Sequence, residues 1–252
     1  MAKANVTIGT PCYGGLVTAT YTSSLIDLHR AAPSMGIAVN TAFVAGDALI
    51  TRARSLTVAA FMDQPLATHL MFIDADTGFR PEQIKRMIDL DEDIVGALCP
   101  AKQIDWPHLD ANRLAGEPLE QAGLIYVGTP CSGPALKTRQ GFATAEYVGT
   151  GFMLVKRRVF ERMFEAYPDL KFSAIDSNLK VSKTDQNLYA VFDCLIEPVT
   201  RKYLSEDYSF CLRWKQLGGE IWIDLESELV HVGPTAYRGN SKIRYARLHK
   251  PV

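Results

Sequence analysis

The sequence predicts an α/β protein with a mostly parallel sheet flanked by helices. The strongest indication is an unbroken apolar run, His69–Ile73, that ends at two acidic residues, Asp74 and Asp76. Such a run is typical of a strand buried on both faces. Strand and helix patterns also alternate through the residues before Pro100. The chain has 252 residues, 47% of them hydrophobic, which is enough for one large domain.

The first half of the chain predicts the order β-α-β-α-β-α-β, which is typical of a parallel, helix-covered sheet. Three residues mark helix ends: Gly36 as a C-cap, Asp47 as an N-cap and Pro81 in a first turn. Strands are expected at Val6–Thr10, Ile37–Val44, His69–Asp76 and Ile94–Cys99, and helices at Thr18–Met35, from Gly46–Asp47 to Met62, and from Pro81 onward.

The second half is less regular. Pro100–Glu146 lacks a clear period and is expected to form a long irregular segment, typical of a binding loop. Phe172–Ile196 is expected to be extended or a hairpin. The remaining elements are a strand over Tyr147–Lys156, a helix containing Val159 and Met163, a helix over Ser205–Leu217, and strands at Glu220–Asp224 and Leu229–Val232.

Composition favours an ordinary globular protein. The net charge is −1 and no stretch approaches the roughly 18 apolar residues of a membrane span, so we expect no integral membrane segment and a cytoplasmic location. The five cysteines are scattered without a C-x-x-C pair, which favours free, buried thiols. After Glu228 the chain has no acidic residue but five basic ones, and this tail is expected to be a cationic loop: Arg238, Lys242, Arg244, Arg247 and Lys250.

Asp74 and Asp76 are the first candidate site. Side chains alternate along a strand, so both carboxylates are expected on the same side. Ligands of open α/β sheets bind beyond the carboxyl ends of the strands, where this pair would stand. Two carboxylates there suit a divalent cation and a phosphate-bearing ligand.

Later segments supply possible partners for this pair. Ser205, Glu206 and Asp207 open a helix, where unpaired backbone N–H groups and the helix dipole keep carboxylates ionised. A plain acidic N-terminus remains an alternative for them. His231 ends a predicted strand, and an ordinary packed histidine is the alternative there. Only one of the two arginines in LITRARS, at positions 52 and 54, is expected to face the crevice.

In this order the motifs resemble the GT-A fold glycosyltransferases, especially bacterial proteins close to family 2. The resemblance spans most of the chain, as a single domain with a nucleotide-binding half (1–99), an acceptor and catalytic half (100–233) and a basic C-terminal loop (234–252). It is carried by VTIGTPCYGG, FIDAD, VGTGFMLVKR, YLSEDYSF, LRWKQLGG and the terminal HVG.

The resemblance implies a nucleotide-diphosphate sugar donor, UDP-sugar favoured over GDP-sugar, and an unidentified hydroxyl acceptor. It implies a divalent cation at Asp74, Asp76 and His231, with Asp207 as catalytic base and Glu206 beside it. Mn²⁺ is preferred to Mg²⁺ because imidazole joins the oxygen ligands. The donor is expected to contact Thr10, Pro11, Tyr13, Arg54, Asp74, Ala75, Asp76, Gly149, Thr150 and Gly151. Apart from the resemblance, the cationic side chain of Arg238 or Lys242 is expected to fold over the diphosphate once donor binds and to screen it from water.

Several alternatives remain at this stage. Inversion at the sugar is favoured, but a carboxylate pair at a helix start also suits a retaining enzyme. A non-catalytic protein that binds nucleotide sugars would keep Asp74 and Asp76 but tolerate loss of Asp207. A nucleotidyltransferase is disfavoured because CYGG is too short for its glycine-rich loop, and a glycoside hydrolase has no use for a metal-binding set.

Overall fold

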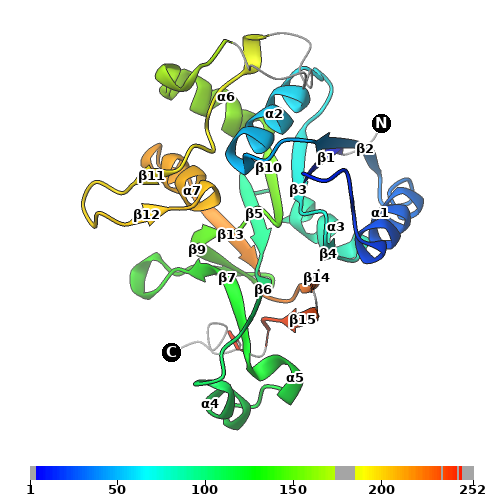
Figure 1. The fold of residues 1–252 in the computed structure, drawn as a ribbon, viewed down its shortest axis with the longest axis vertical. Coiled ribbons are helices and arrows are strands. Elements are labelled where there is room, and N and C mark those ends of the chain that lie inside the picture. The colour runs from blue at the N-terminus through cyan, green and yellow to red at the C-terminus, as the bar shows by residue number, and fades with distance from the viewer. Residues whose placement is uncertain (1–3, 174–184, 234, 243, 246–252) are drawn as a thin grey trace.

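The computed structural model describes residues 4–173, 185–233, 235–242, 244 and 245 (Figure 1). The strands are β1 (Ala4–Cys12), β2 (Ile37–Ala45), β3 (His69–Ile73), β4 (Thr77–Gly78), β5 (Ile94–Ala97), β6 (Cys99–Ile104), β7 (Leu124–Pro130), β8 (Thr138–Arg139), β9 (Phe142–Val148), β10 (Phe152–Lys156), β11 (Leu195–Ile196), β12 (Tyr203–Leu204), β13 (Ile221–Asp224), β14 (Glu228–Val232) and β15 (Ala236–Asn240). The α-helices are α1 (Ala19–Ala31), α2 (Ile50–Met62), α3 (Pro81–Leu90), α4 (Leu109–Leu114), α5 (Leu119–Ala122), α6 (Arg157–Ala166) and α7 (Glu206–Gln216), and short 3-10 helices cover Gly133–Ala135, Pro168–Leu170 and Asp185–Asn187.

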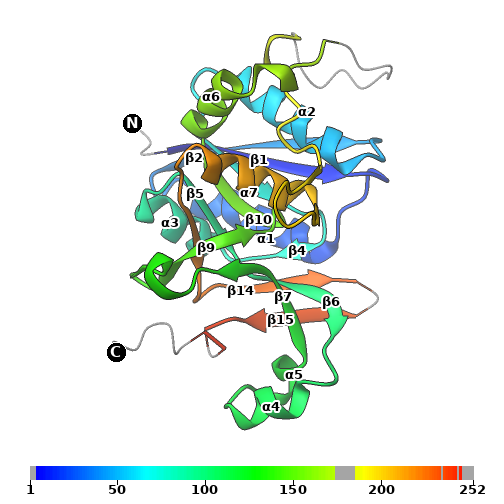
Figure 2. The same ribbon diagram turned by 90° about the vertical axis from the view of Figure 1, so that its left-hand side faces the viewer.

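A large mixed sheet forms the centre of the molecule. Its strand order is β2-β1-β3-β10-β5-β13-β9-β7-β6, with β8 paired to β9. Helices lie on both sides of it, and β4, β14 and β15 form a small separate sheet (Figures 1 and 2). The predicted class, a central sheet flanked by helices, is confirmed at this level.

The mostly parallel pairing holds for only part of the sheet. β1 is parallel to β2 and β3, and β13 is parallel to β5. β10 lies antiparallel between β3 and β5, and the pairs β13–β9, β9–β7 and β7–β6 are also antiparallel. An apolar run has the same pattern in either direction, so sequence alone cannot show that β10 inserts between two strands that precede it.

Strand β3 is buried on both faces, as its apolar run predicts. Leu70 and Phe72 pack in the core under α2, α6 and α7, while Met71 and Ile73 pack in the core under α1 and α3. All four side chains are 0% exposed. This burial fixes β3 as a central strand and sets where its carboxyl end emerges.

Most predicted helices are confirmed with shorter bounds. Pro81 opens α3, whose Ile84 and Met87 are buried, and Ser205 precedes α7. Helix α1 ends at Ala31, and Gly36 lies in the following turn with φ 69°. Asp47 is not the N-cap of α2, because Leu49 takes that position and Asp47 accepts its N–H at 3.0 Å instead.

Three expectations for the second half are wrong. Pro100–Glu146 is not irregular: it contains β6, β7 and most of β9, with α4 and α5 in a lower lobe (Figure 1). Tyr147–Lys156 is not one strand, because Gly149–Gly151 separates β9 from β10. Ala236–Asn240 is not loop but strand β15, paired with β14. These strands are half-exposed or interrupted, so their apolar pattern is weak. Positions 174–184 of the expected extended segment lie outside the described residues.

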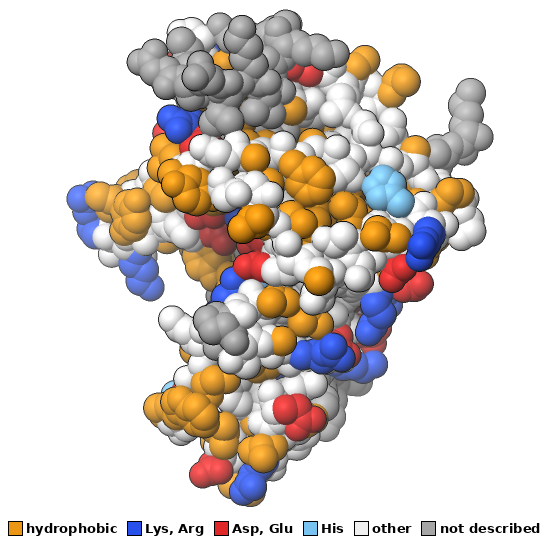
Figure 3. Space-filling model, turned by 45° about the vertical axis from the view of Figure 1, so that its right-hand side comes forward, with side chains coloured by type: hydrophobic (Ala, Val, Ile, Leu, Met, Phe, Trp, Pro, Cys, Tyr) orange, Lys and Arg blue, Asp and Glu red, His pale blue; other side chains and the backbone are white. Residues whose placement is uncertain are grey.

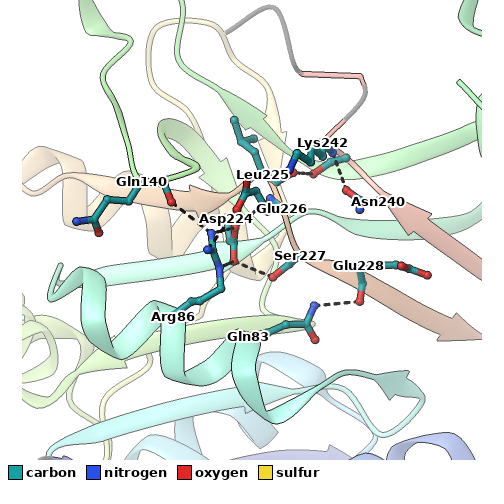
Figure 4. A network of polar contacts seen from close by, with 11 residues as sticks. Gln83, Arg86, Gln140, Asp224, Leu225, Glu226, Ser227, Glu228, Asn240 and Lys242 are labelled. Atoms are coloured by element: carbon teal, nitrogen blue, oxygen red, sulfur yellow. Dashed lines mark hydrogen bonds and ion pairs between the residues drawn. The ribbon is translucent and has the colours of Figure 1, made fainter. Parts of the chain in front are cut away.

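A polar network joins α3 to the end of β13 and the small sheet (Figure 4). Asp224 is 0% exposed and accepts from Arg86 Nε at 3.1 Å and Nη2 at 3.0 Å. It also accepts from Ser227 Oγ at 2.9 Å, and Gln83 Nε2 donates to the Glu228 carbonyl at 2.9 Å. The network therefore holds the turn that leads into β14.

His69, at the start of β3, should make the stability of the folded protein sensitive to acid. Its burial, together with Lys156, lowers its pKa from 6.5 to about 4. Between these two pH values the unfolded chain therefore binds a proton at His69 that the folded chain does not bind. Stability should therefore fall as the pH drops from about 6.5 towards about 4. Urea unfolding at about pH 7 and about pH 4.5 should show that His69→Gln removes about 2 to 3 kcal/mol of this acid-dependent loss. An equal loss in both proteins would contradict the assignment.

Candidate functional site

A cleft opens where β1 and β3 end and β10 begins. It has a volume of about 450 Å³. In a space-filling view, acidic and basic side chains gather in a hollow between the upper part of the molecule and the lower lobe (Figure 3). The residues that line the cleft are Pro11, Cys12, Tyr13, Leu16, Asp47, Ala48, Ile50, Arg54, Asp74, Ala75, Asp76, Lys102 and His231.

The two aspartates lie in a turn rather than on the strand itself. β3 ends at Ile73, and the Thr77 N–H donates to the Asp74 carbonyl at 3.0 Å, which closes the turn. The expectation of strand alternation is therefore wrong, although both carboxylates do reach the same cleft. Each carboxylate meets different partners, because the turn points them in different directions.

Asp74 and Glu206 are both ion-paired with Arg54, which lies between them. The Arg54 side chain is 5% exposed, and it donates from Nη2 to Asp74 at 3.1 Å and from Nε to Glu206 at 3.1 Å. Its Nη1 is buried without a hydrogen-bond partner among the described residues. Buried donors are normally paired, so this nitrogen is a candidate contact for a ligand oxygen. Arg52 binds Asp47 and is not itself among the residues that line the cleft, so only one of the two arginines lines it, as expected.

Asp76 is held from two other strands. His231 Nε2 lies 3.2 Å from Asp76 Oδ1, and Lys102 Nζ contacts Oδ2. The pairing of β14 with β4 sets His231 opposite Thr77, the residue after Asp76. His231 Nδ1 lies 2.8 Å from the Pro100 carbonyl, which turns Nε2 towards the carboxylate. The structure thus brings Asp76 and His231 together, as the sequence predicted.

The pair Asp76 and His231 is charged at neutral pH. Burial alone would lower the pKa of His231, but its hydrogen bonds to Asp76, Cys99 and Pro100 outweigh burial and raise the pKa to about 10. Burial likewise opposes ionisation of Asp76, yet His231 and Lys102 hold its pKa below the ordinary value. The ammonium of Lys102 and the imidazolium of His231 therefore bring two positive charges to one carboxylate.

Asp207 lies at the start of α7, beside Glu206. It accepts from its neighbour's backbone N–H, Tyr208 N, at 2.8 Å and from the Ser205 hydroxyl. Burial is the main reason that its pKa is raised, and Glu206 adds to the rise. A carboxylate with a raised pKa is a stronger base than a free one, which suits it to accept a proton. Glu206 is instead bound to Arg54.

The backbone segment Gly149–Gly151 runs between the carboxylates of Asp74 and Asp207. A Cβ at Gly151 would stand 3.2 Å from Asp74 Oδ2, and one at Gly149 would stand 3.5 Å from Asp207 Oδ2 and 2.8 Å from the Val127 side chain. The backbone therefore passes close to both acids. Thr150 is 1% exposed, and its Oγ1 is buried without a hydrogen-bond partner among the described residues.

The expected nucleobase contacts are only partly assembled. Pro11, Tyr13 and Ala75 line the cleft. Thr10 does not, because it is 0% exposed and its hydroxyl lies 2.7 Å from the Tyr21 hydroxyl in the core. The prediction that Thr10 contacts the nucleobase is therefore wrong for this structure, because its side chain is packed against Tyr21.

The described cations of the basic tail pair with acidic side chains and are not among the residues that line the cleft. Arg238 lies 3.8 Å from Glu228, and Lys242 Nζ lies 3.0 Å from Glu226. Arg244 binds the buried Glu117 at 2.8 Å. These cations are turned towards acidic residues that lie nearby once β14 and β15 pair. That Arg238 or Lys242 folds over the diphosphate once donor binds stays a prediction. Arg247 and Lys250 lie outside the described residues.

Several lining residues were missed as site residues. Asp47 is 4% exposed in the cleft wall, and Arg52 lowers its pKa. Lys102, which the sequence offered only as a plausible lining residue in an apparently irregular segment, lines the cleft and contacts Asp76 from β6. No local signal marks either residue, because their roles depend on strand and turn contacts between distant segments.

The donor atoms of this cleft could hold a divalent cation only after their present partners leave. Asp76 and His231 offer adjacent oxygen and nitrogen ligands, which suit Mn²⁺. Among residues 4–173, 185–233, 235–242, 244 and 245, no three or more His, Cys, Asp or Glu side chains form a ready metal site. Asp74 is turned to Arg54 and Lys102 covers Asp76, so binding requires the ammonium and the imidazolium proton to leave.

No protein-family model matches the sequence, and no curated protein matches it. In three dimensions the chain is similar to A197 from STIV, known from a crystal structure. The TM-score is 0.50 at 13% identity, over 91% of this chain and 86% of that chain. At this identity the likeness supports the fold alone.

Two further findings bear on the expected setting. All five cysteines are free, and four of them are buried, with Cys194 half-buried. No helix among the described residues has the length and apolar character needed to cross a bilayer.

Proposed function

We propose that this chain is a GT-A type glycosyltransferase that moves a sugar from a nucleoside-diphosphate sugar, UDP favoured over GDP, to an acceptor hydroxyl. The observation that supports this most is that one cleft gathers Asp74, Asp76 and His231, while Arg54 links Asp74 to the acidic start of α7. The order of motifs resembles that family, and the mixed sheet with helices on both sides is compatible with its fold.

In the proposed reaction Asp207 is the base. The acceptor oxygen forms a bond to the anomeric carbon of the sugar as the bond from that carbon to the diphosphate breaks, and Asp207 takes the proton of the acceptor hydroxyl. Attack from the side opposite the diphosphate inverts the sugar. Glu206 is a weaker candidate for the base because Arg54 binds its carboxylate.

Other residues hold the donor in the proposed complex. Arg54 Nη1, which has no hydrogen-bond partner in the described part of the chain, would meet a donor oxygen. The bare backbone at Gly149 and Gly151 would let the sugar approach both acids. Asp76 and His231 would hold Mn²⁺ or Mg²⁺. Such a cation stabilises the negative charge that builds on the departing diphosphate.

The test is nucleotide binding measured by calorimetry with UDP, GDP and ATP, each with Mn²⁺ and with EDTA. Metal-dependent binding of a diphosphate supports the proposal, while selective binding of the triphosphate favours a nucleotidyltransferase. Absence of binding by all three nucleotides would contradict it. A crystal soaked with UDP and Mn²⁺ would then locate the ligands.

Asp76→Ala should abolish metal-dependent UDP binding, with a loss of about a hundredfold or more, because it removes the carboxylate that would ligate the cation. Asp27→Ala is the matched control, since Asp27 is exposed on α1 and pairs only loosely with Arg30, at 3.7 Å. It should bind UDP as the parent does. Retained Mn²⁺-dependent binding in Asp76→Ala would exclude Asp76 as a ligand.

A further inference from the structure

Lys102 occupies the position beside Asp76 where a cation would bind. Its ammonium contacts Asp76 Oδ2, while Oδ1 faces His231 at 3.2 Å. Both carboxylate oxygens therefore have positively charged partners already. A metal ion cannot coordinate Oδ2 while the ammonium lies against it, so the two cations exclude one another.

The fold directs Lys102 to this place. Lys102 lies on β6, two residues after Pro100, whose carbonyl contacts His231 at 2.8 Å and so joins β6 to β14. The aliphatic part of Lys102 passes over Gly233, where an added Cβ would lie only 3.0 Å from Lys102 Cδ. That spacing is tighter than ordinary contact, so glycine at 233 gives the lysine its path to Asp76.

The lysine is also able to leave. Its side chain is 35% exposed, on a flexible four-carbon stem, and Asp76 is 30% exposed. The contact is half-buried rather than locked in the core. If the proposed function is correct, the displaced ammonium would remain in the cleft, near the diphosphate of the donor.

From these contacts we propose that Lys102 competes with the divalent cation for Asp76, and so keeps metal affinity low until Lys102 is displaced. This inference rests on the proposed function in one respect only, which is the identity of the nucleotide ligand that binds after the metal. The competition itself concerns Mn²⁺ alone. Lys102 is a positioning residue in this account, since it acts through the state of Asp76.

The experiment measures Mn²⁺ alone, by electron paramagnetic resonance of the free ion, with the full chain and no nucleotide. Lys102→Met and Lys102→Gln should bind Mn²⁺ about five- to tenfold more tightly than the parent, because each removes the competing charge. Lys102→Arg keeps the charge and should stay within about twofold of the parent. Adding Asp76→Asn to Lys102→Met should remove the gain.

A matched control is available on α3. Lys85 pairs with Asp89 at similar exposure, 31% and 41%, and is not among the residues that line the cleft. Lys85→Met should leave Mn²⁺ affinity unchanged, which separates a local effect from a general loss of positive charge. Circular dichroism should show the same fold in all variants.

The proposal is overturned if Lys102→Met and Lys102→Gln bind Mn²⁺ no more tightly than the parent, including the case in which none of them binds it. It is also overturned if Lys85→Met gives the same gain. Failure of the glycosyltransferase proposal would appear elsewhere, as absent nucleotide binding or transfer, because this titration contains no nucleotide.

Discussion

Asp207→Asn is expected to lower kcat by about a hundred- to ten-thousandfold while donor binding stays within about twofold, because the amide cannot take the proton of the acceptor. Asparagine has nearly the same shape, and its oxygen can still accept from Tyr208 N at the position where Asp207 does so, 2.8 Å away. Sugar transfer and UDP binding, measured on the same preparation, separate the two effects.

The pH profile sharpens this test. The base must be ionised, so kcat should fall as the pH drops through the pKa of Asp207, which burial raises above its ordinary value of 3.8. Asp207→Asn should lack this acid limb. An equal limb in both proteins would assign it to another group.

Glu206→Gln provides the matched comparison. Glu206 directly precedes Asp207 in the chain but binds Arg54 Nε at 3.1 Å. Loss of the Glu206 carboxylate should therefore change donor affinity more than kcat. If Asp207→Asn turned over as the parent does, Asp207 would not be the base. If catalysis were lost only in Glu206→Gln, the base would be Glu206 instead of Asp207. Donor binding without transfer in the parent would favour the non-catalytic alternative.

Arg86→Met should destabilise the folded protein by about 3 kcal/mol or more, because it leaves the carboxylate of Asp224 in the core without its cation. Asp224 is 0% exposed, and Arg86 supplies two of its hydrogen bonds, at 3.0 and 3.1 Å. Methionine preserves much of the apolar stem that packs near Phe142. Urea unfolding gives the free energy directly.

Two variants check the cause. Adding Asp224→Asn to Arg86→Met should recover part of the lost stability, since the buried group is then neutral. Lys85→Met, which breaks an exposed pair on the same helix, should change stability by less than about 1 kcal/mol. Equal costs for Arg86→Met and Lys85→Met would contradict a special role for the network.

Local patterns predicted the candidate site best where its residues directly follow a strand or open a helix. Asp74 and Asp76 follow the buried run of β3, and Glu206 and Asp207 open α7 behind Ser205. These features depend on neighbours in the chain. The contact of Lys102 with Asp76 could not be predicted, because β6 is only half-buried and its pattern is weak. The ion pair of Arg238 with Glu228 could not be predicted, because the two residues lie side by side only after β14 and β15 pair.

The order of residues was sufficient to specify an α/β chain, a buried β3 and acids at its carboxyl end, since periodicity and capping act over a few positions. Long-range pairing decided the rest. Insertion of β10 made the sheet mixed, the β4–β14 register set His231 beside Asp76, and the approach of β6 brought in Lys102. Such contacts join residues far apart in the chain, where burial and hydrogen bonding of whole elements outweigh any local preference.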